Sequence, residues 1–515
     1  MECFDLSGIW TCEIPGQRAP LCLPGTLDES GIGHPDDPEK QWKADEVQRI
    51  GFWRKGDPIV TRLTRKYAYE GPARITRTVD WPKPADRRVF VDVERARCLR
   101  LWVNGKEAFP RSAASLSTPY SFEVTDLVTG HDQLTFQSDN SYPELPREAI
   151  VYSSAASDET QTNWNGLLGY LRLRVEKMNY LSEVRVYPHG DRLDVAVQFD
   201  CAREITGTLC ISSPALREPI EIASTISPDR QALSLRDLPL AADIRRWDVE
   251  EGNLYPLTVS FPGLGRKTVS FGVRDFCARD GHLTLNGRRI FLRSEANCAV
   301  FPETGYCPMA VDAWKEILLK YRAYGVNCMR FHSHCPPEAA FTAADALGML
   351  MQPELSHWDP AHAFQSEEAR RYYHDELRQI LRHLANHPSF VMLTFGNELQ
   401  ADAAGHAFMD TLLQAARAYD ATRLYANGSN PHYGQMGIDP CSDFYAAMSY
   451  RGMEMRATCD SMTGWLNQEY PNARHCYDKT MAALRAVSDQ PVFSFEVGQY
   501  EVLPDFGEID QYHGV

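Results

Sequence analysis

The chain has 515 residues, and its 53 Lys and Arg against 69 Asp and Glu give a net charge of −16. This acidic balance argues against nucleic acid or an anionic membrane surface as the main partner. The sequence has no run of 18 or more apolar residues and no basic segment followed by an apolar one at its start, so we expect neither a membrane span nor a signal peptide.

The 14 cysteines are scattered and form no C-x-x-C pair, which argues against a zinc ribbon or a thioredoxin-like site. Buried free thiols in a reducing compartment are the expected interpretation. A cytoplasmic location follows, or a periplasmic or secreted one if a signal peptide has been removed.

Residues 1–178 are rich in strand signals. Two strands are predicted at Arg88–Ala96 and Leu99–Ala108, and the Asn104-Gly105 pair inside the second is a strong hairpin signal. Tryptophans supply core or sugar-facing rings in this region, with the core favoured for each: Trp10, Trp53, Trp81, Trp102 and Trp164.

Residues 179–276 contain short strands at even spacing, among them SEVRVYP, LDVAVQFD, TGTLCISS and YPLTVSF. This pattern predicts a small β-sandwich of the immunoglobulin type.

From residue 277 to residue 515, predicted strands alternate with predicted helices. One helix is expected at Asp312–Gly325, with Asp312 as its cap, and two more lie in PEAAFTAADALG and EEARRYYHDELRQILRHLANH. Strands are expected in VNCMRFHSH, MLMQPEL and FVMLTFGNE. This alternation indicates parallel βα units, and therefore a (β/α)8 TIM barrel.

Polar side chains cluster where these predicted strands end. In RFHSH, residues 330, 332 and 334 alternate, so all three are expected on one face of the strand. The full candidate set is Arg330, His332, His334, Glu354, Asn397, Glu398, Asn427, Asn430 and Glu496. In a TIM barrel the active site lies at the carboxyl ends of the strands, so we expect these residues to line one catalytic mouth.

Two carboxylates on different strands of one barrel fit glycoside hydrolysis. One donates a proton to the leaving oxygen, and the other is ionised and attacks the anomeric carbon. A lone Glu after a strand could equally form a structural ion pair, but two of them beside an Arg and histidines favour catalysis.

A metal site at His332, His334 and His357 is an alternative, since two histidines at i and i+2 on a strand can bind zinc. Arg330 shares their expected face and would repel a cation, so we predict no metal and no cofactor. Histidines held by core hydrogen bonds, or in direct contact with sugar, remain the two other interpretations.

The sequence resembles glycoside hydrolase family 2, which contains β-galactosidases, β-glucuronidases and β-mannosidases. LSGIW and LCLPGTLDESGIG resemble the opening of the family's sugar-binding jelly-roll domain, and NWNGLLGYLRL resembles its closing strand. FGVRDFCARDGHLTLNGRRIFLRS resembles the passage from the immunoglobulin-like domain into the barrel. NHPSFVMLTFGNEL resembles the family's acid/base signature.

The resemblance implies a jelly-roll domain at 1–178, an immunoglobulin-like sandwich at 179–276 and the barrel at 277–515. It implies that Glu398 is the general acid/base, that Asn397 holds the sugar 2-hydroxyl and that Glu496 is the nucleophile. It also implies retention of anomeric configuration. Arg330 falls where the family carries an Arg on the second barrel strand, and His332, His334, Glu354 and Asn427 are expected to bind substrate.

The loop RSEANCAVFPETGY differs from the family's usual first-strand pattern, and no Asn-x-Lys motif of the family's glucuronidases follows the catalytic region. We therefore expect an exo-acting enzyme on terminal β-D-galactosides or equivalent pyranosides such as the α-L-arabinopyranosides of plant cell-wall glycans. The alternatives are a β-glucuronidase or β-mannosidase, a non-catalytic carbohydrate-binding protein, and a metal-dependent barrel hydrolase. A homo-oligomer is left open.

Seven barrel strands are expected, with their ends near Ser294, His334, Glu354, Glu398, Asn427, Tyr450 and Glu496. The sixth is predicted at Asp443–Tyr450. Too few residues follow Glu496 for a helix, an eighth strand and its helix, because a crossover takes about a dozen residues. The sequence thus predicts a barrel that lacks its C-terminal part, as a fragment or as a chain that another chain completes.

Overall fold

The computed structural model describes residues 2–35, 65–157, 162–359, 361–429, 438–455, 476–494, 496–497 and 505–511. The chain forms two compact units. The first comprises Met1–Lys177, Cys298–Met309 and Asp505–Val515, and the second comprises Met178–Asn297 and Ala310–Pro504. The sequence predicts that the barrel takes up all of 277–515, whereas two short stretches of that range group with the first unit.

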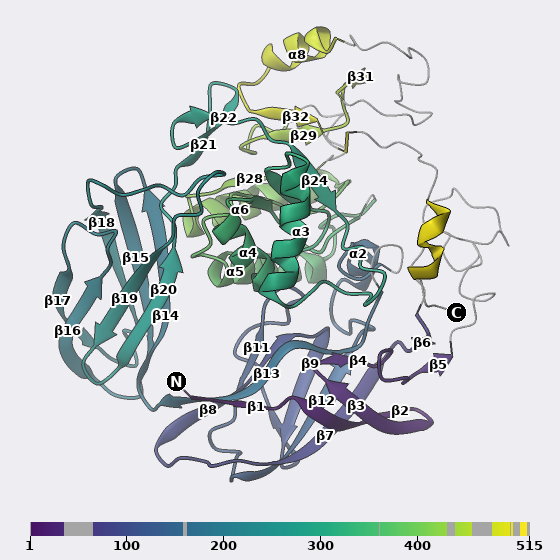
Figure 1. Cartoon of the computed structure of the whole chain (residues 1–515), viewed down its shortest axis with the longest axis vertical. Helices are drawn as coiled ribbons and strands as arrows, with labels where there is room; N and C mark the ends of the chain where they lie inside the picture. Colours follow the sequence, from purple (N-terminus) through teal and green to yellow (C-terminus); the bar gives the residue numbers. More distant parts are fainter. Residues whose placement is uncertain are drawn as a thin grey trace. The chain divides into compact units, whose positions relative to one another are not determined.

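The first unit is a β-sandwich whose two sheets share one core (Figure 1). One sheet has the strand order β1 (Glu2–Asp5), β13 (Gly166–Lys177), β8 (Arg87–Arg95), β11 (Tyr120–Glu123), with β4 (Gly25–Thr26) against β13. The other has the order β10 (Lys106–Ala108), β9 (Cys98–Val103), β12 (His131–Asp139), β7 (Pro72–Asp80), β2 (Gly8–Ile14), β3 (Gln17–Leu23). Smaller elements are β5 (His34–Pro35), β6 (Tyr67–Ala68), α2 (Arg147–Tyr152) and the 3-10 helix η2 (Phe506–Gln511).

The alternation of apolar and polar residues explains this sandwich. In β2 and β9 every second side chain is buried, as a sheet with one face toward a core requires. The predicted hairpin is confirmed, because β9 and β10 are joined by Asn104 and Gly105, both with positive φ. Trp10, Trp81 and Trp164 are buried and confirm their core prediction, Trp102 is half-buried, and Trp53 lies outside the described residues. The jelly-roll label stays a prediction.

The second unit begins with a smaller sandwich of two sheets around one core. The sheets are β14 (Tyr180–His189), β15 (Arg192–Asp200), β18 (Ala232–Pro239), and β17 (Ile220–Ile226), β16 (Ile205–Ser212), β19 (Tyr255–Phe261), β20 (Gly265–Phe271). The four predicted strands are confirmed as β14, β15, β16 and β19. The sheets hold three and four strands, a division that fits the immunoglobulin type, and that label stays a prediction.

A three-stranded antiparallel sheet leads into the barrel: β21 (Phe276–Arg279), β22 (His282–Leu285) and β23 (Arg288–Arg289). Seven strands then pair in parallel among the described residues: β24 (Ser294–Asn297), β25 (Cys328–Phe331), β26 (Leu350–Gln352), β27 (Met392–Thr394), β28 (Leu424–Ala426), β29 (Tyr445–Ala447) and β32 (Val492–Ser494). Single parallel bridges link β26 to β27. A short antiparallel hairpin, β30 (Ser449–Tyr450) and β31 (Met453–Glu454), follows β29.

Helices lie beside these strands (Figure 1): α3 (Val311–Ala323), α4 (Glu338–Leu347), α5 (Glu367–His383), α6 (Ala403–Tyr419) and α8 (Asp478–Arg485). The three predicted helices are confirmed as α3, α4 and α5. Ser366 caps α5 and Gly348 ends α4 in the left-handed conformation. The cap assigned to Asp312 is wrong, because α3 starts one residue earlier and Asp312 lies in its first turn.

The barrel strands are shorter than predicted. β25 ends at Phe331, β26 at Gln352 and β27 at Thr394. Apart from Arg330, which lies within β25, the polar candidates after these strands therefore lie in the loops that follow. Pro353 has no N–H for a ladder hydrogen bond, and Gly396 at φ 142° takes the chain out of the extended conformation. The first barrel strand starts, and does not end, at Ser294, and the predicted sixth strand divides into β29 and β30.

Contacts from the smaller sandwich fix the amino ends of β27 and β28. The buried Arg274 donates to the carbonyl oxygens of Pro388 at 3.1 Å and Phe390 at 3.0 Å, and also to that of Thr422. Burial and the neighbouring Arg423 lower the pKa of Arg274 to about 10. The chain is therefore anchored just before β27, the strand that leads to Asn397 and Glu398.

His387 leads into β27, and its pairing predicts a pH-dependent stability. Its Nδ1 lies 2.6 Å from Asp345 Oδ2 and its Nε2 lies 3.6 Å from Glu338 Oε1. Although burial opposes the charge, these carboxylates raise the pKa of His387 to about 9. Because the pKa of His387 is higher in the folded state than in the unfolded state, its protonated form stabilises the fold. This stabilisation is fully present below the unfolded pKa of 6.5 and is lost as the pH rises through about 9.

As the pH rises from 6.5 to 9, we expect the free energy of unfolding to decrease by an amount on the order of 3 kcal/mol. The urea concentration at the unfolding midpoint should decrease with it. The His387→Gln variant should be less stable at pH 6 and should show a flatter profile. Parallel pH profiles for the two proteins would contradict the assignment.

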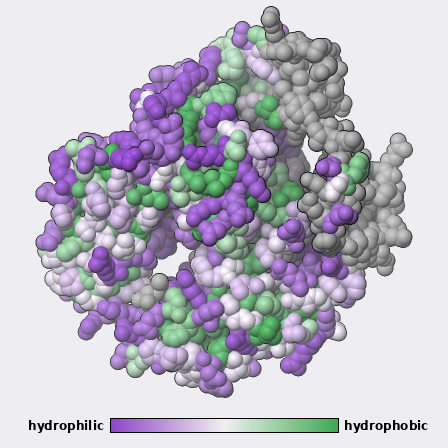
Figure 2. All heavy atoms as spheres, viewed as in Figure 1, coloured by the Kyte–Doolittle hydropathy of each residue, from purple (hydrophilic) through white to green (hydrophobic). Residues whose placement is uncertain are grey.

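No described helix combines the length and the apolar character that crossing a membrane requires. Figure 2 shows hydrophilic side chains, in purple, over much of the face in view, as expected from a chain in which 24% of residues are charged.

Candidate active site

Three of the candidate residues converge on the guanidinium of Arg330, the third residue of β25. Its Nε donates to Glu354 Oε1 at 2.7 Å and its Nη2 donates to Asn397 Oδ1 at 2.7 Å. Its Nη1 lies 3.5 Å from Glu496 Oε1. Arg330 is 6% exposed, so one buried cation joins side chains that follow β26, β27 and β32.

Glu354 is fully buried and holds Arg330. Besides the two bonds from Arg330, it accepts hydrogen bonds from the Ser333 N–H at 2.8 Å, from Thr394 Oγ1 at 3.0 Å and from Ser429 Oγ at 2.5 Å. Burial alone would raise the pKa of Glu354, but Arg330 outweighs it and holds the pKa below its usual range. The sequence predicts that Glu354 binds substrate, whereas these surroundings favour a carboxylate that positions Arg330.

His332 borders Glu496. Its Nε2 lies 3.8 Å from Glu496 Oε1, and its Nδ1 lies 3.1 Å from Ser333 Oγ. Burial, followed by the charge of Arg330, lowers the pKa of His332 to about 3. The imidazole is therefore neutral near pH 7, with one ring nitrogen as a donor and the other as an acceptor.

The prediction that His334 shares a strand face with Arg330 and His332 is wrong. Strand β25 ends at Phe331, and Ser333 adopts a positive φ of 47°, so the alternation does not continue. His334 packs its ring at right angles to that of Phe331, with the centroids 5.4 Å apart, and its Nδ1 lies 3.1 Å from the His332 carbonyl oxygen.

Asn397 and Glu398 lie three and four residues beyond Thr394, the last residue of β27. The Asn397 N–H donates to the His357 carbonyl at 3.0 Å, and the Glu398 N–H donates to the Ser429 carbonyl at 3.0 Å. Asn397 is 1% exposed, and its Nδ2 has no hydrogen-bond partner among the residues described. A buried amide donor without a protein partner, next to the carboxylate-bearing residue Glu398, is suited to a ligand hydroxyl.

Both glutamates occupy the left-handed region of the backbone, with φ 46° at Glu398 and φ 49° at Glu496. Residues other than glycine rarely adopt this backbone conformation, and those that do often lie at functional sites. Glu398 is half-buried, and the side chain of Glu496 is 15% exposed, so both are accessible while their polar neighbours are not.

Asn427 directly follows β28 and is 2% exposed, with its N–H donating to Ser442 Oγ at 3.0 Å. Asn430 lies outside the described residues.

The three histidines of the metal hypothesis do not converge. His357 stacks on Tyr373 with ring centroids 4.2 Å apart, and neither of its ring nitrogens has a partner within hydrogen-bond distance among the described residues. Burial lowers the pKa of His357 to about 3. Its place is a packed aromatic cluster with Phe364 and Tyr373.

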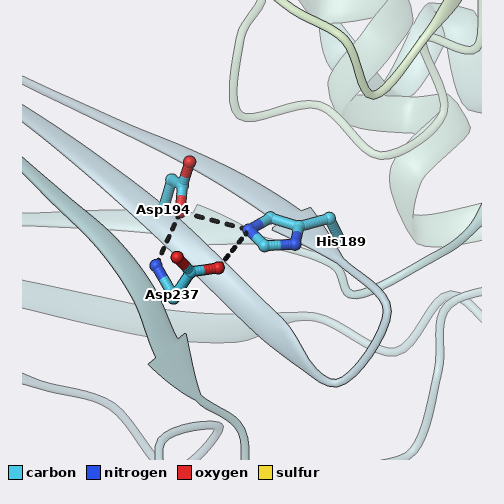
Figure 3. A group of neighbouring side chains, drawn as sticks. All are labelled: His189, Asp194 and Asp237. Carbon is cyan, nitrogen blue, oxygen red and sulfur yellow. Dashed lines mark hydrogen bonds and ion pairs between the residues drawn. The ribbon is translucent and has the colours of Figure 1, made fainter.

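Two other groups bring potential ligand atoms within 4.8 Å of one another in the described part of the chain: His189, Asp194, Asp237 and Asp410, Asp439, Cys441. Figure 3 shows His189 directed at Asp194 and Asp237, with its Nε2 3.1 Å from Asp194 Oδ1. The Arg236 guanidinium lies 2.6 Å from Asp194, so this carboxylate is already paired with a cation of the protein. The group is an ion-pair cluster of the small sandwich.

Sequence reasoning missed Thr394, Ser429, Ser333 and Trp358. Trp358 is half-buried, and its ring meets that of His332 edge-on at 4.9 Å. Its position four residues after Glu354 was the available signal. Ser333 and Thr394 lie inside the stretches already singled out, but nothing in the sequence shows that both bond to Glu354.

A parallel barrel with two accessible glutamates, a buried Arg and an amide donor without a described partner at its carboxyl-end loops has the groups that glycoside hydrolysis requires. Residues 276–510 match the family model described as "Glycosyl hydrolases family 2, TIM barrel domain", so this part of the chain is similar to that family.

The curated relatives include the β-galactosidase large subunit of Latilactobacillus sakei, 24% identical over 75% of this chain. The chain spans 61% of the length of that relative, and less of β-galactosidase BgaC from Bifidobacterium adolescentis. Among solved structures, a family 2 β-galacturonidase from Eisenbergiella tayi aligns with a TM-score of 0.70 at 16% identity, covering 95% of this chain and 80% of its own. This likeness shows the fold alone.

Proposed function

We propose that the protein is a retaining exo-glycosidase that hydrolyses terminal β-D-galactosides or stereochemically equivalent pyranosides such as α-L-arabinopyranosides. The observation that carries the proposal is the Arg330 network, in which one buried cation contacts Glu496 and also the amide that precedes Glu398. The names of the curated relatives, several of which are β-galactosidases, support the choice of sugar.

The proposed reaction is a double displacement. A carboxylate oxygen of Glu496 attacks the anomeric carbon while Glu398 gives its proton to the glycosidic oxygen, so that the C–O bond to the leaving group breaks. Glu398 then takes a proton from water, and that water attacks the anomeric carbon and releases Glu496. The net change is addition of water across the glycosidic bond with retained configuration.

The neighbouring groups have distinct proposed roles. Arg330 orients Glu496, and the open Nδ2 of Asn397 donates to the sugar 2-hydroxyl. His332, neutral near pH 7, contacts a second hydroxyl beside Glu496. Trp358 offers an aromatic face for the apolar side of the pyranose ring.

A uronidase is the second candidate, since solved neighbours include β-galacturonidases and the β-glucuronidase of Bacteroides uniformis. The described surroundings favour a neutral sugar, because the cation of Arg330 already faces Glu354 and Glu496.

Hydrolysis of 4-nitrophenyl glycosides tests the proposal. We expect kcat/KM to be largest for the β-D-galactoside or the α-L-arabinopyranoside, and at least about tenfold lower for the β-D-glucuronide, β-D-galacturonide and β-D-mannoside. Proton NMR of the first product should show the β-anomer from the galactoside. A uronide or mannoside as the best substrate would replace the proposed sugar, and binding without turnover of all five would favour a carbohydrate-binding protein.

A further inference from the structure

Ser429, three residues beyond β28, brackets the loop that carries Glu398. Its N–H donates to the Gly396 carbonyl at 3.0 Å, and its own carbonyl accepts the Glu398 N–H at 3.0 Å. Together these two bonds pair Ser429 with Asn397 in a parallel bridge. Because Gly396 and Glu398 both have positive φ, the loop follows no regular strand path, and its shape depends on these bonds.

The side chain of Ser429 reaches the other part of the site. Its Oγ donates to Glu354 Oε1 at 2.5 Å and lies 3.3 Å from both Thr394 Oγ1 and Gln352 Nε2. Ser429 is 0% exposed, so water does not replace these contacts. A hydrogen bond from a buried hydroxyl to a carboxylate is charge-assisted, and therefore short and strong.

Ser429 therefore connects the Glu398 loop with Glu354, two parts of the site that are far apart in the sequence. Its backbone fixes the Glu398 loop, and its hydroxyl fixes Glu354, which holds Arg330 beside Glu496. We propose that Ser429 is a positioning residue that sets the place of Glu398 relative to Arg330 and Glu496. This assignment rests on the proposed glycosidase function.

Thr394 provides a matched comparison. Its Oγ1 donates to the same oxygen, Glu354 Oε1, at 3.0 Å, but its backbone bonds to Leu355 and Pro353 and not to the Glu398 loop. A change at Thr394 weakens the support of Glu354 alone. Loss of the Ser429 hydroxyl leaves the two backbone bonds in place but removes the bond that fixes residue 429 to Glu354, so residue 429 and the Glu398 loop paired with it can shift together relative to Arg330.

The test compares Ser429→Ala with Thr394→Val on a galactoside with an activated leaving group, 2,4-dinitrophenol, and on one with a poor leaving group, methanol. For Ser429→Ala we expect kcat on the methyl galactoside to fall about tenfold to hundredfold, with KM nearly unchanged and the activated substrate affected less than about threefold. Thr394→Val should lower both substrates by similar factors. Ser389→Ala, which removes a buried hydroxyl at the amino end of β27, should leave both unchanged.

An equal loss on both substrates in Ser429→Ala, or the same profile as Thr394→Val, overturns the assignment, because a structural support would act in that way. An unchanged Ser429→Ala enzyme overturns it as well. A wild-type protein that hydrolyses none of the glycosides overturns the proposed function and this assignment with it, whereas an active wild type with an unselective variant overturns the assignment alone.

Discussion

Replacing Glu496 with Ala should lower kcat/KM on every glycoside by at least about 10⁴-fold, which corresponds to about 5 kcal/mol of transition-state stabilisation. Without this carboxylate no covalent glycosyl-enzyme can form, and Arg330 loses the partner 3.5 Å from its Nη1. Added azide should restore turnover in this variant and give a glycosyl azide of inverted configuration, because a small anion can occupy the vacated space.

Glu295→Gln is the matched control for that measurement. Glu295 lies on β24, a strand of the same barrel, but its carboxylate faces Tyr321 of α3 at 3.5 Å. We expect its kcat/KM to equal that of the wild type. If Glu496→Ala keeps more than about a tenth of wild-type activity, or if Glu295→Gln loses as much, then Glu496 is not the nucleophile.

Periodicity in the sequence predicts most of the fold. The two sandwiches follow from alternating strands and from the Asn104-Gly105 turn, while α4 and α5 follow from helical spacing and from Gly348 at the end of α4. These signals are local, since each depends on side chains within one element and on the core that the element meets. Strand ends were predicted less well, because Pro353 and the positive φ at Ser333 stop the ladder before the polar residues begin.

The candidate site was predicted by position and not by contact. The rule that barrel chemistry lies at the carboxyl ends of strands selected Arg330, Asn397, Glu398 and Glu496, and the structure brings the first two and Glu496 into contact. The partners of Glu354 could not be predicted, because Ser333, Thr394 and Ser429 reach it from three separate segments of the chain. Such long-range hydrogen bonds depend on backbone turns that leave no periodic trace in the sequence.

Burial separates the roles that the sequence analysis grouped together as substrate binding. Glu354 is fully buried and accepts hydrogen bonds from four residues, whereas the Nδ2 of the equally buried Asn397 has no described partner. A buried polar group without a partner costs free energy in the unliganded protein and regains it when a ligand bonds to it. Asn397 is thus better suited than Glu354 to direct contact with a sugar.

Replacing Glu398 with Ala should produce a selective loss. Turnover of a methyl galactoside should fall about 10²- to 10⁴-fold, because methanol leaves only when it is protonated, whereas the first step with 2,4-dinitrophenyl galactoside should change little. With this activated substrate the second step becomes limiting, so pre-steady-state mixing should show a burst of dinitrophenol. Azide should speed the second step and give a glycosyl azide of retained configuration, the opposite of the product from Glu496→Ala.

The two azide products differ because the two glutamates act on opposite faces of the sugar. Removal of Glu398 opens space on the face from which the leaving group departs. Equal loss on both galactosides, without a burst and without rescue by azide, would show that Glu398 is not the acid/base.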